Sequence, residues 1–140
     1  MHLNPYLSFN GQCEEAFRFY EQCFRGKIVS IFRNADMPGN EQVPAEWRDK
    51  VMHATLVADG DTFMGADSPP DRYQRPAGFS VSISVTDPAE AERIYEALSE
   101  KGEVYMPLQQ TFWAVRFGML RDRYGIPWMI NCEQSQGPNV

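Results

Sequence analysis

The stretch Ala16-Phe-Arg-Phe-Tyr-Glu21 returns 75 positions later as Ala91-Glu-Arg-Ile-Tyr-Glu96, with Ala, Arg, Tyr and Glu in the same places. Both copies lie in segments whose apolar residues follow the 3.6-residue period of an amphipathic helix. A tandem duplication explains the recurrence better than chance, because a unit of about 60 residues does not close a large core alone. The sequence therefore predicts two related modules.

The elements expected around the two helices come in the same order. Each helix is preceded by one strand and followed by three, and the last two strands of each module are joined by a tight turn. The expected strands cover residues 3–9, 27–32, 51–58 and 62–65, then 79–85, 103–106, 112–120 and a closing strand from 126. Asp87 and Pro88 begin the second helix as N-cap and first helical residue, and Gly26 and Gly102 are expected to end the two helices.

This order predicts an α+β fold: tandem βαβββ modules forming a curved mixed sheet, with the helices outside and a cavity inside. The expected organisation is a single domain, 1–140. It consists of module 1 at about 3–66, a linker at about 67–77, module 2 at about 78–133 and a tail at 134–140. Residues 33–50 form a long polar loop with one short helix near Glu46. Loops of this length commonly bind something or cover a cavity.

Composition excludes several classes of function. The net charge is −6 and no basic run exists, so we expect no nucleic-acid partner. The sequence has no apolar run of about 18 residues and no signal peptide, which predicts a cytoplasmic protein without a membrane partner. Cys13 and Cys23 would lie about 15 Å apart on one helix, too far for a disulfide. These two and Cys132 are expected to be buried, reduced thiols.

The strands that open the two modules each have a small, polar face. These faces carry Asn4, Tyr6 and Ser8 in one strand, and Ser80, Ser82 and Ser84 in the other. One interpretation is the solvent side of an antiparallel sheet, and the other is a shared ligand pocket. The duplication favours the pocket. Alternation in the closing strand puts Met129 and Asn131 on the same pocket face, with Trp128 and Ile130 in the core.

Three further residues have both a structural and a functional interpretation. His53 is either a hydrogen-bonded structural residue or a general base. Arg116, within an aromatic strand, pairs with a carboxylate on a neighbouring strand or anchors an anionic substrate. Trp113 belongs to the core or to the wall of a cavity.

The chain resembles the PhnB-like family of the vicinal oxygen chelate superfamily, which has the glyoxalase, bleomycin-resistance and extradiol-dioxygenase fold. The resemblance extends from Leu3 to about Glu133. It is carried by Pro5-Tyr-Leu-Ser-Phe-Asn-Gly11, Glu14-Glu-Ala16 with Phe19-Tyr20, Met52-His-Ala-Thr-Leu56, Thr111-Phe-Trp113 and Asp122-Arg-Tyr-Gly-Ile-Pro-Trp-Met-Ile-Asn131. It implies paired βαβββ modules and a homodimer. The family often carries a demethylubiquinone methyltransferase label, but no glycine-rich strand-to-helix turn for S-adenosylmethionine occurs here.

The resemblance also implies where metal-dependent relatives hold their ion. The corresponding positions here are Asn4, Ser80 and Met129, with a fourth near Met64 and Asp67 beyond it. A divalent site needs imidazole or carboxylate at about three points, and Asn, Ser and Met are poor substitutes. We therefore expect a metal-free pocket and no cofactor.

The leading hypothesis is a protein that binds a small metabolite in a metal-free pocket. One form of this hypothesis has an anionic metabolite as the ligand. The first alternative is an isomerase, lyase or transferase, with or without a divalent metal, in which His53 is the catalytic base and Arg116 the anion anchor. The second is a dimeric structural protein with a vestigial site. The candidate ligand-binding residues are Asn4, Tyr6, Ser80, Ser82, Trp113, Arg116, Met129 and Asn131.

Overall fold

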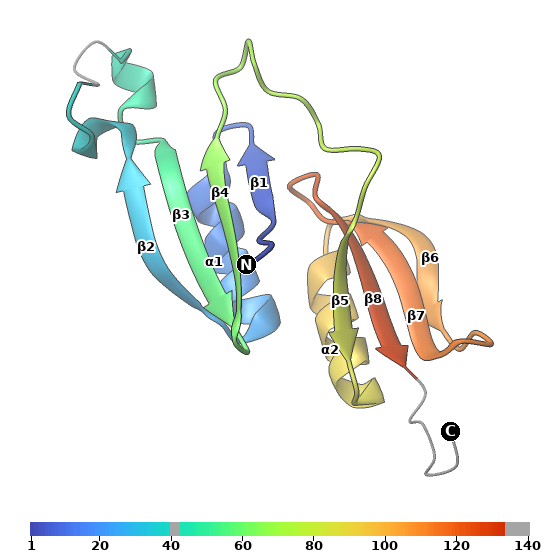
Figure 1. Ribbon diagram of the computed structural model, residues 1–140. Helices are drawn as coiled ribbons and strands as arrows, with labels where there is room; N and C mark the ends of the chain where they lie inside the picture. Colours follow the sequence, from blue (N-terminus) through green and yellow to red (C-terminus); the bar gives the residue numbers. More distant parts are fainter. Residues whose placement is uncertain (40–42, 134–140) are drawn as a thin grey trace. The chain divides into compact units, whose positions relative to one another are not determined.

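The computed structural model describes residues 1–39 and 43–133, so the predicted tail, 134–140, lies outside the described residues. The chain divides into two compact units, Met1–Arg75 and Pro76–Val140. Figure 1 shows that both units consist of one sheet and one long helix. Within the described ranges, no helix is long and apolar enough to cross a membrane.

The first unit is a four-stranded mixed sheet with one helix packed on it. Strand β1 pairs in parallel with β4, while β4 and β2 each pair antiparallel with β3, so the order across the sheet is β1-β4-β3-β2. The elements are β1 (Tyr6–Phe9), α1 (Cys13–Phe24), β2 (Lys27–Arg33), 3-10 turns at Asn34–Asp36 and Ala45–Trp47, β3 (Val51–Ala58) and β4 (Asp61–Asp67).

The second unit repeats this topology. Strand β5 pairs in parallel with β8, and the order across its sheet is β5-β8-β7-β6. The elements are β5 (Val81–Val85), α2 (Pro88–Ser99), β6 (Glu103–Gln109), β7 (Ala114–Arg121) and β8 (Pro127–Glu133). The predicted α+β fold of tandem βαβββ modules is confirmed, with the strands divided between two sheets.

Each helix covers one face of its own sheet and forms the core there. Phe17 and Tyr20 of α1 are fully buried and contact Phe63 of β4 at ring-centroid distances of 5.4 and 5.8 Å. In the second unit, Leu98 of α2 and Trp128 of β8 are buried on the corresponding face. The N-cap prediction for α2 is confirmed, because the Asp87 side chain accepts a hydrogen bond from the Ala89 N–H at 3.1 Å.

Three strands begin two or more residues later than predicted. Leu3, Phe79 and Phe112 were expected inside strands, but they precede β1, β5 and β7 and are 88%, 53% and 90% exposed. The pairing of β1 with its parallel neighbour β4 begins at Tyr6. Alternation of apolar and polar residues shows which face a residue would take. It does not show where the partner strand ends.

The glycines that follow the helices act differently from the prediction. The left-handed conformation belongs to the preceding residues, Arg25 (φ 52°) and Lys101 (φ 60°). Gly26 and Gly102 instead permit a strand to approach closely. A Cβ at Gly26 would lie 2.7 Å from the Val57 carbonyl oxygen, and one at Gly102 would lie 2.5 Å from that of Arg121. The glycines mark the helix ends correctly, but the reason is packing against the sheet.

The long loop between β2 and β3 is tied together where it leaves the sheet. The Asn34 N–H donates to the Lys50 carbonyl at 3.1 Å, and the Ala35 N–H donates to the Arg48 carbonyl at 3.0 Å. The Asn34 side chain also donates to the Trp47 carbonyl at 2.9 Å. The short helix predicted near Glu46 is present, while the turn at Asn34–Asp36 was not predicted.

Candidate functional site

Each sheet has a second face, which its own helix does not cover. In the first unit, the strand register and the burial of alternate residues place polar and apolar side chains together on this face. We call it the first open face. Its members are Tyr6 and Ser8 of β1, Met64 and Ala66 of β4, His53 and Thr55 of β3, and Ser30 and Phe32 of β2.

A hydrogen-bonded chain of three side chains lies on the first open face. The Tyr6 hydroxyl lies 3.3 Å from His53 Nδ1, and His53 Nε2 lies 3.0 Å from Thr55 Oγ1. Strand β4 separates β1 from β3, so Tyr6 and His53 meet across it. Each hydroxyl both donates and accepts, so a neutral imidazole satisfies the chain in either direction. Burial raises the pKa of Tyr6, and the nearby Cys13 raises it further, so the phenol stays protonated at neutral pH.

The second unit has a corresponding open face with different chemistry. In its middle row, Met129 of β8 pairs with Ser82 of β5 and with Met119 of β7, which pairs with Met106 of β6. We call the side of this sheet on which these residues lie the second open face. Its members are Ser82 and Ser84 of β5, Met129 and Asn131 of β8, Phe117 and Met119 of β7, and Met106 and Gln109 of β6.

Asn131 has an unusual position on the second open face. Its side-chain oxygen, Oδ1, is buried and has no hydrogen-bond partner among residues 1–39 and 43–133. Its partners across the sheet are Ser84 and Phe117. The Phe117 ring is 5.4 Å from that of Trp113, which in turn meets Phe112 edge-to-face at 4.7 Å. A buried acceptor and a partly exposed aromatic cluster are therefore adjacent.

The structure does not bring all the predicted site residues together. Tyr6 and His53 meet in the first unit, and Ser82, Met129 and Asn131 share the second open face. Asn4 and Ser80 precede the strands that were expected to hold them.

Arg116 lies on the opposite, helix-facing side of the second sheet. Its register partner is the buried Cys132, and its Nε donates to Glu92 of α2 at 3.1 Å. The carboxylate partner considered from the sequence is thus present, on a helix instead of a strand. Trp113 precedes β7 and packs on Phe117.

Comparison of the two units shows how far the duplicated faces have diverged. The row Tyr6–Met64–Thr55 in the first unit corresponds to the row Ser82–Met129–Met119 in the second. The Met at the centre is common to both, but the hydroxyl of Thr55 is replaced by a thioether. Sequence analysis missed Thr55, Met119 and Phe117 as site residues. The available signal was their alternation with buried neighbours along β3 and β7.

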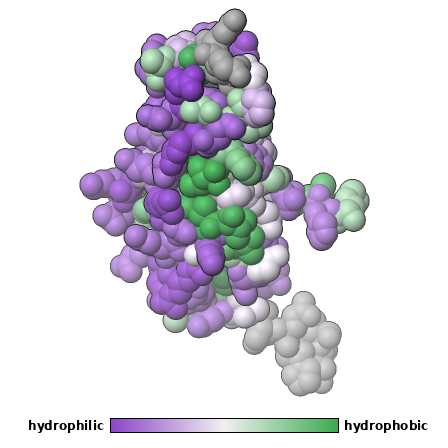
Figure 2. Space-filling model, turned by 90° about the vertical axis from the view of Figure 1, so that its left-hand side faces the viewer, coloured by the Kyte–Doolittle hydropathy of each residue, from purple (hydrophilic) through white to green (hydrophobic). Residues whose placement is uncertain are grey.

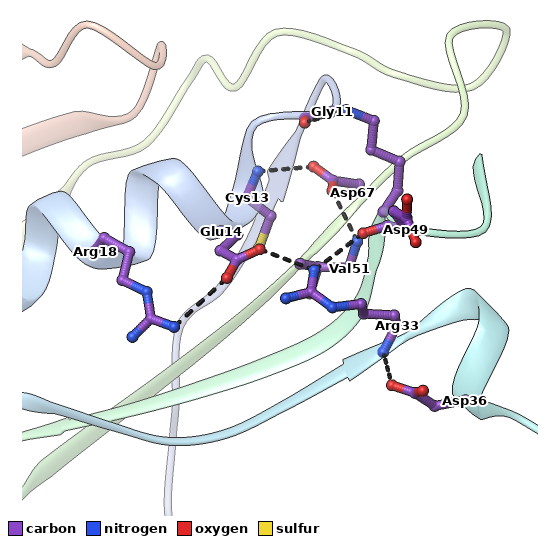
Figure 3. A network of polar contacts seen from close by, with 10 residues as sticks. Gly11, Cys13, Glu14, Arg18, Arg33, Asp36, Asp49, Val51 and Asp67 are labelled. Atoms are coloured by element: carbon purple, nitrogen blue, oxygen red, sulfur yellow. Dashed lines mark hydrogen bonds and ion pairs between the residues drawn. The ribbon is translucent and has the colours of Figure 1, made fainter. Parts of the chain in front are cut away.

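A network of polar contacts holds together the end of the first unit that lies next to the loop between β2 and β3 (Figure 3). Asp67 accepts the Cys13 N–H with one carboxylate oxygen and the Val51 N–H with the other, both at 2.9 Å. It thereby joins the start of α1, the start of β3 and the end of β4. The ion pair of Arg33 with Glu14, at 2.8 Å, lowers the pKa of the Glu14 carboxyl. Asp67 therefore has a structural role that the sequence did not reveal.

Cys13 lies at the centre of this network as a buried, free thiol. Burial raises its pKa strongly, and the charges of Asp67 and Glu14 raise it further. Burial also raises the pKa of Cys132, which is likewise free. Both thiols are therefore protonated at neutral pH and poor nucleophiles.

Comparison with known proteins shows the family to which the chain belongs. The profile described as 3-demethylubiquinone-9 3-methyltransferase matches residues 1–131. The chain belongs to this family, the PhnB-like family. Protein YjdN of Escherichia coli K12 is 31% identical over 97% of this chain and 98% of its own length.

Solved structures support the same assignment for this PhnB-like chain. Protein PA1353 of Pseudomonas aeruginosa is 46% identical, with a TM-score of 0.88 over 96% of this chain and 99% of its own. A PhnB protein from Bacillus cereus is 28% identical, with a TM-score of 0.78 over 94% of this chain and 99% of its own. A glyoxylase/bleomycin resistance protein/dioxygenase domain from Frankia shares the fold at 15% identity and a TM-score of 0.64, over 95% of each chain.

The residues of this PhnB-like chain do not fit a divalent metal at the positions that the resemblance implied. Asn4 and Ser80 offer neutral oxygens, and Met64 and Met129 offer thioethers, which suit soft ions. Both oxygens of Asp67 already accept main-chain hydrogen bonds. In the described ranges, no group of three or more His, Cys, Asp or Glu side chains is placed to hold a metal ion.

Proposed function

We propose that the protein binds a small organic molecule through its open sheet faces, without a metal ion. The observation that carries this proposal is the Tyr6–His53–Thr55 chain. It holds three polar side chains in a fixed relation on a sheet face that also carries the thioether of Met64 and the ring of Phe32. Ligand sites typically combine apolar surface with a few positioned polar groups. Tyr6 is half exposed, so its hydroxyl remains accessible to a ligand.

An anionic ligand group would meet His53 and Tyr6. The alternative anchor, Arg116, already pairs with Glu92 on the other side of the second sheet. Both Tyr6 and His53 can donate a hydrogen bond to an anion, and an imidazolium would add a positive charge.

The same chain supports the enzyme alternative. A general base needs a proton acceptor that neighbouring groups orient, and His53 has such a neighbour at each ring nitrogen. Because the chain is satisfied in both directions, taking up a proton at one end and releasing it at the other needs only a reversal of its hydrogen bonds. An isomerase, lyase or transferase acting next to a carbonyl or phosphonate-like anion would use His53 in this way.

The family label of methyltransferase finds little support at the turns that would hold S-adenosylmethionine. The turn from β1 to α1 is Asn10-Gly11-Gln12, and the turn from β5 to α2 is Thr86-Asp87. Neither is the glycine-rich loop that places a cofactor against a helix N-terminus. Binding or proton-transfer chemistry on the open faces is therefore the stronger proposal.

Replacing His53 by Ala is expected to weaken ligand binding at least tenfold, because it removes the group that joins Tyr6 to Thr55. Ligands found in a metabolite library by thermal shift would be titrated against both proteins by calorimetry. His2→Ala is the matched control, since His2 is exposed at the N-terminus and outside the sheet. The titrations should give the same affinity after treatment with EDTA. Unchanged affinity in His53→Ala would remove the first open face from the site, and loss of binding in EDTA would refute metal independence.

We also propose that the protein is a cytoplasmic homodimer. Figure 2 shows hydrophobic residues gathered on the side where β2 lies in Figure 1. Val29, Phe32 and Met52 of β2 and β3 are the exposed large hydrophobic residues in this part of the first unit. Contiguous apolar surface is commonly covered in an assembly. Sedimentation velocity should show a dimer that Phe32→Glu weakens, and a monomer at all concentrations would contradict the proposal.

A further inference from the structure

The buried oxygen of Asn131 needs a hydrogen-bond donor. In native proteins nine in ten or more buried polar groups have a partner, and an unpaired acceptor costs free energy. Asn131 Oδ1 has none among the described residues. Reversing the side-chain amide would place an N–H₂ group at the same buried position, which would need an acceptor in place of a donor. The second open face therefore holds a buried polar atom that a bound molecule can satisfy.

The surface next to Asn131 is soft, apolar and adaptable. Met106, Met119 and Met129 lie in directly paired positions on three neighbouring strands, and each is partly exposed. Thioethers are polarisable and flexible, and they make favourable contacts with aromatic rings. Three of them side by side form a surface that adjusts to a flat ligand at little cost. Branched aliphatic side chains would be stiffer at the same positions.

Aromatic side chains are adjacent to the same position. Phe117 is the register partner of Asn131 and touches the half-exposed Trp113, whose ring meets Phe112 edge-to-face. Aromatic rings associate well in offset or edge-to-face geometry. A planar ring lying on the methionines next to Asn131 would thus find aromatic partners at one border.

The middle of the second open face carries no charge. Its two central rows consist of Ser, Met, Asn, Phe and Gln residues. The nearest guanidinium in the register, Arg121, already donates to the carbonyl groups of Pro76 and Gly125 and to the Tyr105 hydroxyl. Burying an unpaired charge on such a surface is unfavourable, which selects for a neutral group.

We propose that the second open face binds a neutral, planar aromatic or conjugated ring that packs on Met119 and Met129 and donates an N–H or O–H to Asn131 Oδ1. This inference rests on the proposed function, small-molecule binding, and names the class of ligand. It also assigns the two units different tasks. The first unit offers polar and proton-exchanging groups, while the second recognises an unsaturated ring by its donor.

Matched pairs of small probes test the inference on the full chain. The pairs are indole with 1-methylindole and 2-naphthol with 2-methoxynaphthalene, and in each pair a methyl group replaces the donor hydrogen. Titration by NMR should show that the donor member of each pair binds about tenfold more tightly. This preference should vanish in Asn131→Val and persist in Asn131→Asp, which keeps the acceptor. Met129→Ala should weaken both members equally, while Met37→Ala, in the segment between β2 and β3 of the other unit, should leave both unchanged.

The outcomes separate this inference from the proposal on which it rests. Equal affinity within the pairs, or a preference that survives in Asn131→Val, overturns the inference. Probes or metabolites whose binding depends on His53 but not on Asn131 or Met129 also overturn it, and leave the proposed function standing. If neither the probes nor any metabolite binds the wild-type protein, both are wrong. Circular dichroism of all three variants shows whether a loss of probe binding reflects misfolding. If Asn131→Val does not fold, Asn131→Asp and Met129→Ala still test the inference.

Discussion

Replacing Asp122 by Asn is expected to lower the free energy of unfolding by about 3 kcal/mol, a large part of a typical domain's stability. Asp122 is 4% exposed and organises the turn before the closing strand. One carboxylate oxygen accepts the N–H groups of Tyr124 and Ile126 at 2.8 and 3.1 Å, and the other accepts the Trp128 indole N–H at 2.7 Å. Asn keeps one acceptor but turns an N–H₂ group toward a donor, so a buried donor loses its partner.

Urea denaturation of both proteins at neutral pH, followed by circular dichroism, measures this difference. Asp71→Asn is the matched control, because Asp71 is exposed in the segment between β4 and β5 and the same charge is removed. We expect the control to change stability by less than about 0.5 kcal/mol. If Asp122→Asn is as stable as the control, then the three hydrogen bonds do not hold the turn.

Gly102→Ala is expected to destabilise the protein by about 2 to 3 kcal/mol through overpacking. The added Cβ would lie 2.5 Å from the Arg121 carbonyl oxygen and 3.2 Å from the Asp122 Cα. Both contacts are with main-chain atoms, so rotation of a side chain cannot relieve them. The substitution pushes the passage from α2 to β6 away from the end of β7, where the turn containing Asp122 begins.

Gly78→Ala separates this steric effect from backbone strain. Gly78 has φ +79°, and a Cβ there meets nothing within 4 Å. Its cost is that of holding alanine in the left-handed region, about 1 kcal/mol. Thermal unfolding should therefore rank Gly102→Ala below Gly78→Ala, and Gly78→Ala below wild type. A reversed order would mean that the close approach at Gly102 relaxes without cost.

The fold was predictable because its signals are local and occur twice. The repeated helical segment predicted the duplication. The Asp87 cap and the tight turn expected between the last two strands of module 1, which is Asp59-Gly60, placed element boundaries. The closing strand was predicted in detail: Trp128, Ile130 and Cys132 are buried, while Met129 and Asn131 lie on the open face. Period-2 alternation is reliable in such a strand because its helix-facing side is fully covered.

The site was less predictable because its contacts join strands that are distant in sequence. Tyr6 of β1 reaches His53 of β3 across β4, which lies between these two strands. Alternation along a strand does not give the order of strands in the sheet. Arg116 lies on the helix side because it alternates in step with Gly118 and Leu120, which face α2 along a regular stretch of β7. Alternation groups these residues on one face, but it does not show that this face is the one that the helix covers. The unpaired oxygen of Asn131 depends on what surrounds it in space.

The parallel pairing of β1 with β4 also determines when the first open face can form. Hairpin β3–β4 joins residues that are close in sequence, whereas β1 must pair with a strand from the far end of its unit. Loop-closure entropy delays such non-local contacts during folding. We expect β1 to dock late, so that Tyr6 reaches His53 only in the final stage. A ligand bound to both residues would then hold β1 on the sheet. The lifetime of the folded unit would therefore depend on how much of the protein has ligand bound.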